Sequence, residues 1–206
     1  MAIATIDTRP SAPRIFPCDV IIVNNFDGNF LSKAIRFFGK SWSHTANGWF
    51  DIVHSGIASQ TVFEANLLIG PTDWETTFND PDYDIRVYQW VNHTKKMDEV
   101  AWELYKRYNA DSYGAGQLLW FIWRWMVEGL HLPARWARKN FIPNSEVCTE
   151  VVYMGFKLLE DPVVNSVLAR LNRNQDTVNP GDIIWVCEEL IKLGLMKRTY
   201  NRERAK

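Results

Sequence analysis

Short runs of β-branched and aromatic residues alternate with polar turn residues through the first half of the chain, and each run predicts a strand. The runs occur at residues 18–25, 44–50, 60–66 and 83–90. Between the first two, apolar residues at helical spacing over 30–38 predict a helix that ends at Gly39. Residues 70–82 are rich in Pro, Asp, Asn and Thr, so we expect a loop there. The order β–α–β–β–β favours an antiparallel meander.

Helical spacing takes over in the second half of the chain. Apolar residues at positions i, i+3, i+4 and i+7 predict an amphipathic helix over 97–108. Residues 118–127 are apolar on nearly every side, but this run is much shorter than the roughly twenty residues that cross a bilayer, which favours a core helix. Residues 183–187 fit either a last strand or the start of a helix that runs to 195. Strands followed by helices predict the α+β class.

The patterns predict a single domain over residues 18–196, with an aromatic helical insert at about 116–142. Residues 1–17 contain three prolines and predict a flexible leader, and the basic residues 197–206 predict a frayed tail. The leader lacks the apolar stretch of a secretory signal peptide. We therefore expect a cytoplasmic protein or one released by lysis, which includes a phage-encoded or virion-associated protein.

Composition narrows the classes of function. The chain has 206 residues, of which 47% are hydrophobic, and its net charge of -1 gives no reason to expect nucleic acid as a partner. Ten tryptophans indicate a large buried aromatic cluster or a surface for sugar, lipid or protein. Cys18, Cys148 and Cys187 are too far apart for a disulfide framework or a Cys-x-x-Cys metal site. We expect no metal and no other cofactor.

One cysteine lies where a nucleophile would be activated. Pro143, Asn144 and Ser145 precede an apolar helical run, so with Ser145 as the cap Cys148 falls in the first turn of a helix. The partial positive charge of that turn favours thiolate over thiol. The alternative is that Cys148 is a small core residue of a buried helix, since free cysteine is among the most buried residue types.

A histidine and a carboxylate are placed to complete a site with that thiol. His44 begins a strand whose same-face neighbours are small, although a structural role is commoner for a lone histidine. Glu64 lies within the next strand, where a carboxylate is unusual unless that face is exposed or the group has a partner. A thiol nucleophile needs a base, and the base needs a third group to orient it. We predict Cys148 as nucleophile, His44 as general base and then acid, and Glu64 as the orienting group.

Four segments of the sequence resemble those of a known family. They are DVIIV with FLSKAIR at 19–36, SHTA at 43–46, VFEA at 62–65 and EVCTEVVY at 146–153. Tyr113-Gly114 and the Pro-Gly-Asp at 180–182 fit two further positions. Together they resemble the circularly permuted papain-like group, the YiiX/YebB-like relatives of NlpC-type cell-wall peptidases, to which lecithin:retinol acyltransferase-like proteins also belong. In that group the histidine precedes the cysteine.

The resemblance implies a permuted papain-like fold, in which a small antiparallel β-sheet or half-barrel packs against the helix that bears the nucleophilic cysteine. It implies Cys148, His44 and Glu64 as the catalytic triad. Tyr113 and Ser43 are further candidates for contacts with the substrate or the oxyanion.

The chain also departs from the family pattern at three places. Cys18 replaces the usual glycine, and residues 47–49 replace an apolar strand. The insert over 120–142 is longer and more aromatic than in a compact member. These departures affect the expected substrate more than the expected triad.

The leading hypothesis is a thiol-dependent hydrolase, a cysteine peptidase or amidase, that cleaves an amide bond through an acyl-enzyme. Its substrate would be a peptidoglycan peptide or other cell-wall fragment, or an isopeptide-like bond. One alternative is a lipid-directed thiol esterase or acyltransferase, because the aromatic and basic segment 118–139 is suited to a membrane surface. Another is a non-catalytic papain-like binding or structural module. A zinc hydrolase has no HExxH or Cys-x-x-Cys spacing to support it.

Overall fold

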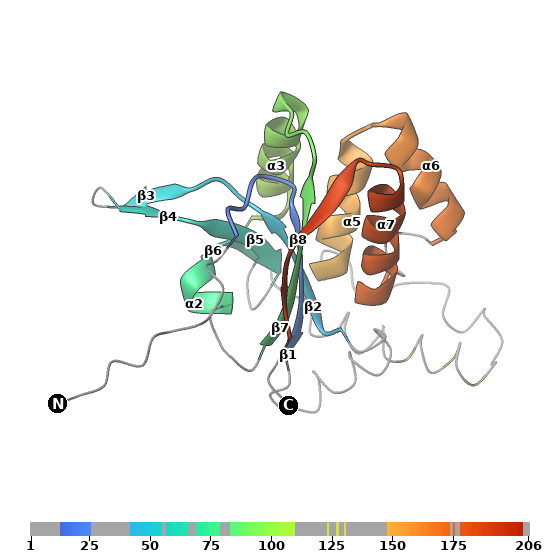
Figure 1. Ribbon diagram of the computed structural model, residues 1–206, viewed down its shortest axis with the longest axis horizontal. Coiled ribbons are helices and arrows are strands. Elements are labelled where there is room, and N and C mark those ends of the chain that lie inside the picture. Colours follow the sequence, from blue (N-terminus) through green and yellow to red (C-terminus); the bar gives the residue numbers. More distant parts are fainter. Residues whose placement is uncertain are drawn as a thin grey trace.

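The structure is a computed structural model that describes most of the chain outside two long segments (Figure 1). The described residues are 13–25, 42–54, 57–65, 69–78, 83–109, 123, 127, 130, 148–173, 175 and 178–203. The helix expected over 30–38 lies outside them, as does nearly all of the insert expected at about 116–142.

An antiparallel sheet of six strands, in the order β6-β5-β2-β1-β7-β8, is the centre of the fold. Its strands are β1 (Val20–Asn25), β2 (His44–Gly48), β5 (Thr61–Ala65), β6 (Ile69–Asp73), β7 (Tyr83–Trp90) and β8 (Met196–Arg202). Every neighbouring pair in the sheet runs antiparallel. The sheet and its covering helices confirm the α+β class.

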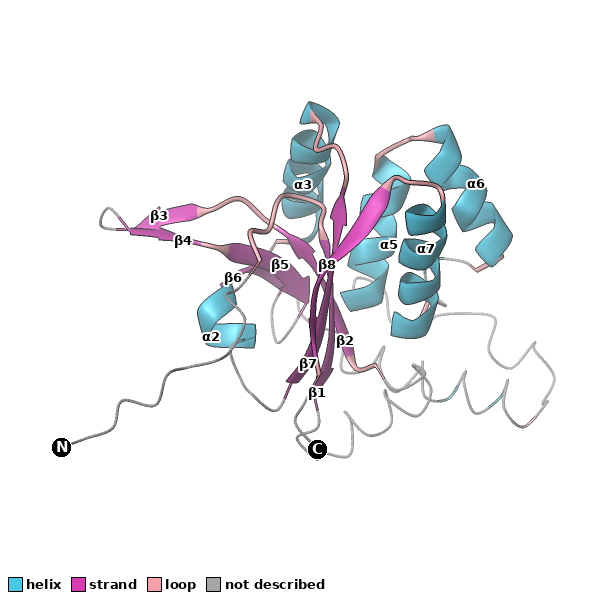
Figure 2. Cartoon of the chain, in the orientation of Figure 1, coloured by secondary structure: helices cyan, strands magenta, loops and turns pink. Residues whose placement is uncertain are grey.

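Both faces of the sheet are buried, because the strands alternate their side chains between two cores. Figure 2 shows the helices, drawn in cyan, beside the magenta strands of the sheet. The helices whose bounds are described are α2 (Trp74–Phe78), α3 (Lys95–Tyr108), α5 (Cys148–Leu158), α6 (Pro162–Leu171) and α7 (Pro180–Lys192). In β1, Val20 and Ile22 pack with residues of α3, α5, α6 and α7, whereas Ile21 and Val23 pack with residues of α2. Among the described residues, no helix is both long and apolar enough to cross a bilayer.

The strand order corrects the expected meander. Strand β7 pairs with β1 rather than with β6, so the chain returns to the middle of the sheet after β6. The loop expected over 70–82 is also wrong in part, because most of it forms β6 and α2. Gly70 and Pro71 obscure this strand in the sequence, and proline is tolerated there because β6 is an edge strand.

The basic tail expected over 197–206 is wrong for its first part. Residues up to Arg202 belong to β8, which pairs with β7 as the other edge of the sheet. Met196 and Tyr200 are buried against the two cores, and the charged residues between them are exposed. Charged outward side chains are common on edge strands because they discourage pairing with another chain.

Residues 183–187, which fit a strand or a helix equally well, belong to α7. The helix starts at Pro180, and a capping box joins Asn179 to Asp182 at its first turn. The side chain of each of these two residues accepts a hydrogen bond from the main-chain N–H of the other. The Pro-Gly-Asp at 180–182 therefore forms the first turn of this helix.

Aromatic residues form a cluster that reaches from the core to the surface. Trp49 is buried, and its ring stacks on those of Phe63 and Tyr105 at centroid distances of 5.1 and 5.6 Å. Trp102 meets the Trp49 ring edge-on and is 49% exposed. A two-stranded ribbon of β3 (Ile52–His54) and β4 (Ile57–Ser59) extends away from the sheet in Figure 1.

Residues 13–17 of the expected flexible leader are bound to the sheet. The Ile15 side chain is buried, and its main-chain N–H donates to Gln60 Oε1 at 2.9 Å. Gln60 also donates to the Pro13 carbonyl oxygen at 2.8 Å. Gly48 permits this approach, since a Cβ at that position would clash with the Phe16 carbonyl oxygen.

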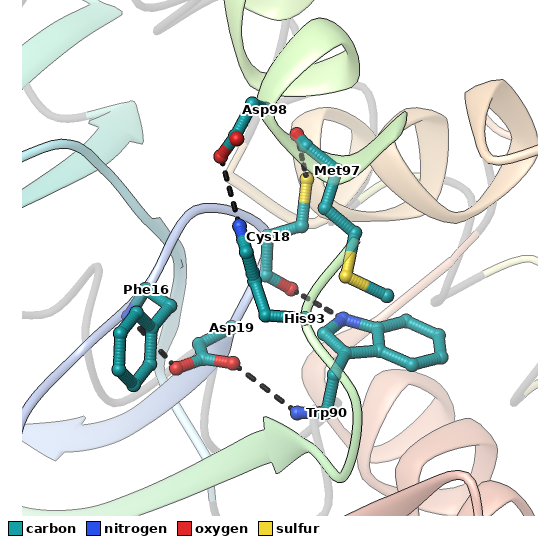
Figure 3. Close-up of polar contacts among 7 residues, drawn as sticks. All are labelled: Phe16, Cys18, Asp19, Trp90, His93, Met97 and Asp98. Atoms are coloured by element: carbon teal, nitrogen blue, oxygen red, sulfur yellow. Dashed lines mark hydrogen bonds and ion pairs between the residues drawn. The ribbon is translucent and has the colours of Figure 1, made fainter. Parts of the chain in front are cut away.

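Asp19 fixes the start of β1 to the end of β7 (Figure 3). Its carboxylate accepts hydrogen bonds from the main-chain N–H groups of Phe16 at 2.9 Å and Trp90 at 3.2 Å, and from Gln89 Nε2 at 2.9 Å. Burial raises the pKa of Asp19 to about 6 despite these donors. The preceding Cys18 has φ of 65°, a left-handed conformation that favours glycine, and its carbonyl accepts from Trp90 Nε1 at 2.9 Å.

We expect Asp19→Ala to lower the free energy of unfolding by about 3 kcal/mol, because the N–H groups of Phe16 and Trp90 would lose their acceptor. Urea denaturation of both proteins measures the difference. Asp98→Ala is the matched control, since it removes a more exposed carboxylate that pairs with His93 at 2.8 Å. That change should cost less than about 0.5 kcal/mol, and equal losses in the two variants would contradict the role of Asp19.

Candidate active site

Cys148 is the first described residue of α5, and it is buried against β2. Helix α5 approaches β2 closely at Gly155, where a Cβ would lie in ordinary contact with the Asn47 side chain. The cap predicted at Ser145 lies outside the described residues. Cys148 is therefore buried, as the alternative interpretation requires, and it is the residue at which the described part of α5 begins.

His44 and Glu64 meet across neighbouring strands, as predicted. His44 is the first residue of β2, and Glu64 lies within β5 opposite Ala46. Residues two apart on a strand share a face, so His44 and Glu64 lie on the same side of the sheet. The His44 Nε2 atom lies 2.7 Å from Glu64 Oε2, with the two side chains 21% and 1% exposed. The remaining ring nitrogen, Nδ1, is left for a second partner.

The thiol of Cys148 interacts electrostatically with the His44 ring, and each of these two groups shifts the pKa of the other. Burial alone would lower the pKa of His44, but the Cys148 and Glu64 charges and hydrogen bonds outweigh it and raise this pKa to about 10. Burial likewise opposes ionisation of Cys148, yet the His44 imidazolium lowers the pKa of the thiol below its ordinary value. The pair is therefore arranged to exist as thiolate and imidazolium.

Glu64 is held from its other side by a residue that the sequence did not reveal. Thr72 Oγ1 donates to Glu64 Oε1 at 2.7 Å, while Oε2 faces His44. Burial raises the pKa of Glu64, but its hydrogen bonds to His44 and Thr72 lower it below the ordinary value overall. Thr72 lies in β6, which the sequence presents as a loop, so no pattern pointed to it.

The other two cysteines differ from Cys148 in their electrostatics. All three are free and buried. Burial raises the pKa of Cys18 and of Cys187 well above the ordinary value, and neighbouring carboxylates add to the effect. The Cys18 thiol donates to the Met97 carbonyl oxygen at 3.2 Å. Among the three cysteines, Cys148 alone has a lowered thiol pKa.

Two weaker predictions have different outcomes. Ser43 is buried next to His44, but its hydroxyl donates to the Val23 carbonyl oxygen at 3.2 Å. This bond uses the proton that an oxyanion contact would need, so the structure gives Ser43 a role in joining β1 to β2. Tyr113 lies outside the described residues, as does most of the segment 118–139 predicted to contact lipid.

Within the described ranges, no group of three or more His, Cys, Asp and Glu side chains is gathered closely enough to hold a metal ion. Compared with known proteins, the chain matches no family model and no curated protein. The grouping of Cys148, His44 and Glu64 is the feature of the structure that points to a function. The His44 imidazole is bound to the Glu64 carboxylate and interacts electrostatically with the Cys148 thiol, which is an arrangement that activates a nucleophile.

Proposed function

We propose that the protein is a thiol-dependent hydrolase that cleaves an amide bond through a Cys148–His44–Glu64 triad. The observation that carries the proposal is the position of the His44 ring between a buried carboxylate and a thiol, with the pKa of the thiol lowered and that of the imidazole raised. Strongly shifted pKa values that arise from burial and a specific partner are typical of catalytic groups.

In the proposed reaction the Cys148 thiolate attacks the carbonyl carbon of the amide, and the carbonyl π electrons move to the oxygen. The main-chain N–H of Cys148, in the first turn of α5, is suited to stabilise that oxyanion. When the tetrahedral intermediate collapses, the C–N bond breaks and the His44 imidazolium gives its proton to the leaving amine. A thioester on Cys148 remains.

Hydrolysis of the thioester completes the cycle. Neutral His44 removes a proton from water, the resulting hydroxide attacks the thioester carbonyl, and the C–S bond breaks to release the acid and restore the thiolate. Glu64, fixed by Thr72, orients the ring through both steps and stabilises its charged form. An alcohol or amine of a lipid that replaced water would make the same site an acyltransferase.

The resemblance to the permuted papain-like group supports the substrate class, since His44 and Glu64 precede Cys148 in the chain as in that group. We infer that the substrate is a peptide amide, either of a peptidoglycan peptide or of an isopeptide-like bond. A helix bearing the cysteine and packed on an antiparallel sheet agrees with this assignment.

A panel of peptidoglycan peptides, isopeptide-linked peptides, simple esters and phospholipids tests the proposal. We expect wild-type protein to cleave amide substrates and, after an acid quench, to carry an acyl group on the peptide that contains Cys148. Amide cleavage without that thioester would contradict the mechanism. Acyl transfer to an added lipid in place of hydrolysis would assign the acyltransferase alternative, and no acyl group from any substrate would favour the non-catalytic module.

A further inference from the structure

One face of β2 carries two polar side chains beneath α5. Strand alternation places Thr45 and Asn47 on the face opposite His44 and Ala46. Asn47 lies next to Gly155 of α5, so this face of the strand is the one that the helix covers. Thr45 precedes Asn47 by two residues on the same face of β2. It directly follows His44, the first residue of the strand.

The Thr45 side chain has an unusual environment for a hydroxyl. Thr45 is 0% exposed, and its Oγ1 has no hydrogen-bond partner within the part of the chain that the structure describes. A buried hydroxyl without a partner costs free energy, so such a group needs a physical explanation. The pairing of β2 with β5 begins at Ala46, so Thr45 also lies just beyond the end of that ladder.

We propose that Thr45 is a further functional residue of the site, one that binds the Cys148 sulfur in its thiolate form by donating both its hydroxyl and its main-chain N–H. A neutral thiol is a weak acceptor, so the Thr45 hydroxyl would gain little from Cys148 in its protonated form. The charged sulfur is a strong acceptor, and hydrogen bonds to a charged group are about twice as strong as neutral ones. Thr45 thus selects the ionised nucleophile.

The electrostatics of the site agree with this role. Burial raises the pKa of Cys148, the charge and hydrogen bond of His44 lower it, and the N–H and hydroxyl of Thr45 lower it further. Among the described residues, further ionisable groups on the elements packed here include Glu64 on β5, which contacts His44, and the buried Glu150 of α5. Thr45 adds two donors to this set without adding a charge.

Thr45→Val and Thr45→Ser separate hydrogen bonding from packing. Valine keeps the volume and removes the hydroxyl, whereas serine keeps the hydroxyl and removes a methyl group. We expect Thr45→Val to raise the pH midpoint of Cys148 alkylation by iodoacetamide by about one unit. At a pH below both midpoints, the variant should then react about tenfold more slowly than the wild type. Serine should follow the wild-type curve. Mass spectrometry of the Cys148 peptide measures the rate separately from the other cysteines.

The opposite order, with serine shifted and valine matching wild type, would show that Thr45 only fills space and would overturn the proposal. Overlaid curves for all three proteins would also overturn it. If valine prevents folding, Thr45→Ala compared with Thr45→Ser tests the same hydroxyl. The inference rests on the proposed function, but alkylation needs no substrate. A wild-type midpoint near the ordinary value of about 8.5 would count against the proposed function itself.

Discussion

Cys148→Ala should lose essentially all turnover, with kcat lower by at least about 10⁴-fold on any amide that the wild type cleaves. Alanine removes the sulfur that forms the thioester, and no other described cysteine has a lowered thiol pKa to replace it. Only binding and oxyanion stabilisation would remain. Steady-state rates of wild type and Cys148→Ala on the substrate panel give the ratio of their kcat values. Circular dichroism of the same preparations shows whether the variant is folded.

Cys187→Ala is the matched control for that loss. Cys187 is also buried and free, but burial and the Glu188 carboxylate raise the pKa of its thiol, and neither His44 nor Glu64 is among the groups that shift it. We expect Cys187→Ala to retain kcat within about twofold while losing some stability, as small core truncations do. Equal turnover in wild type and Cys148→Ala would refute the proposed chemistry.

The second large effect is expected for His44→Ala. This change removes the base, and it also removes the positive charge and hydrogen bond that lower the pKa of Cys148. We therefore expect kcat/KM to fall by at least about 10³-fold, with the alkylation midpoint of Cys148 rising to or above its ordinary value of about 8.5. Both quantities are measured on one preparation, as a rate on the best substrate and as a pH series with iodoacetamide.

His93→Ala provides the control for His44→Ala. His93 also pairs with a carboxylate, Asp98 at 2.8 Å, but both groups are partly exposed, and neither is among the groups that shift the pKa of Cys148. Turnover and the alkylation midpoint should both match wild type. If His44→Ala lowers turnover and leaves the midpoint unchanged, the thiolate is stabilised by something other than the imidazolium, and the assignment of the ion pair is wrong.

The sequence predicts the central strands and the contact between His44 and Glu64 because each depends on a local pattern. Strand β7 spans Tyr83–Trp90, the residues that the alternation marks, and α3 covers the amphipathic run over 97–108. The His44–Glu64 contact follows from the two-residue period of neighbouring strands. A glutamate buried in the middle of a strand needs a polar or charged partner, so the position of Glu64 already indicated that it has one.

The edges of the sheet and the supports of the site could not be predicted in the same way. Strand β6 contains Gly70 and Pro71, and β8 is mostly charged, so neither resembles a buried strand. Both are edge strands. One side of an edge strand pairs with no other strand of the sheet, so polar and charged residues and proline are tolerated there. Thr72 lies on β6 and was missed for that reason. Thr45 belongs to the segment 43–46 that resembles the family motif. Its proposed role as a donor to Cys148 could not be inferred from the sequence, because it depends on the packing of α5 against β2.

The pH dependence of Cys148 alkylation in the wild-type protein tests the active-site assignment most directly. The lowered pKa of Cys148 and the raised pKa of His44, about 10, define a window in which the thiolate–imidazolium pair exists. We expect the Cys148 peptide to react at its thiolate rate throughout neutral pH, with a midpoint well below 8.5 and a second change near pH 10, where His44 loses its proton. A single midpoint at or above about 8.5 would show an ordinary buried thiol and would contradict the assignment of Cys148 as an activated nucleophile.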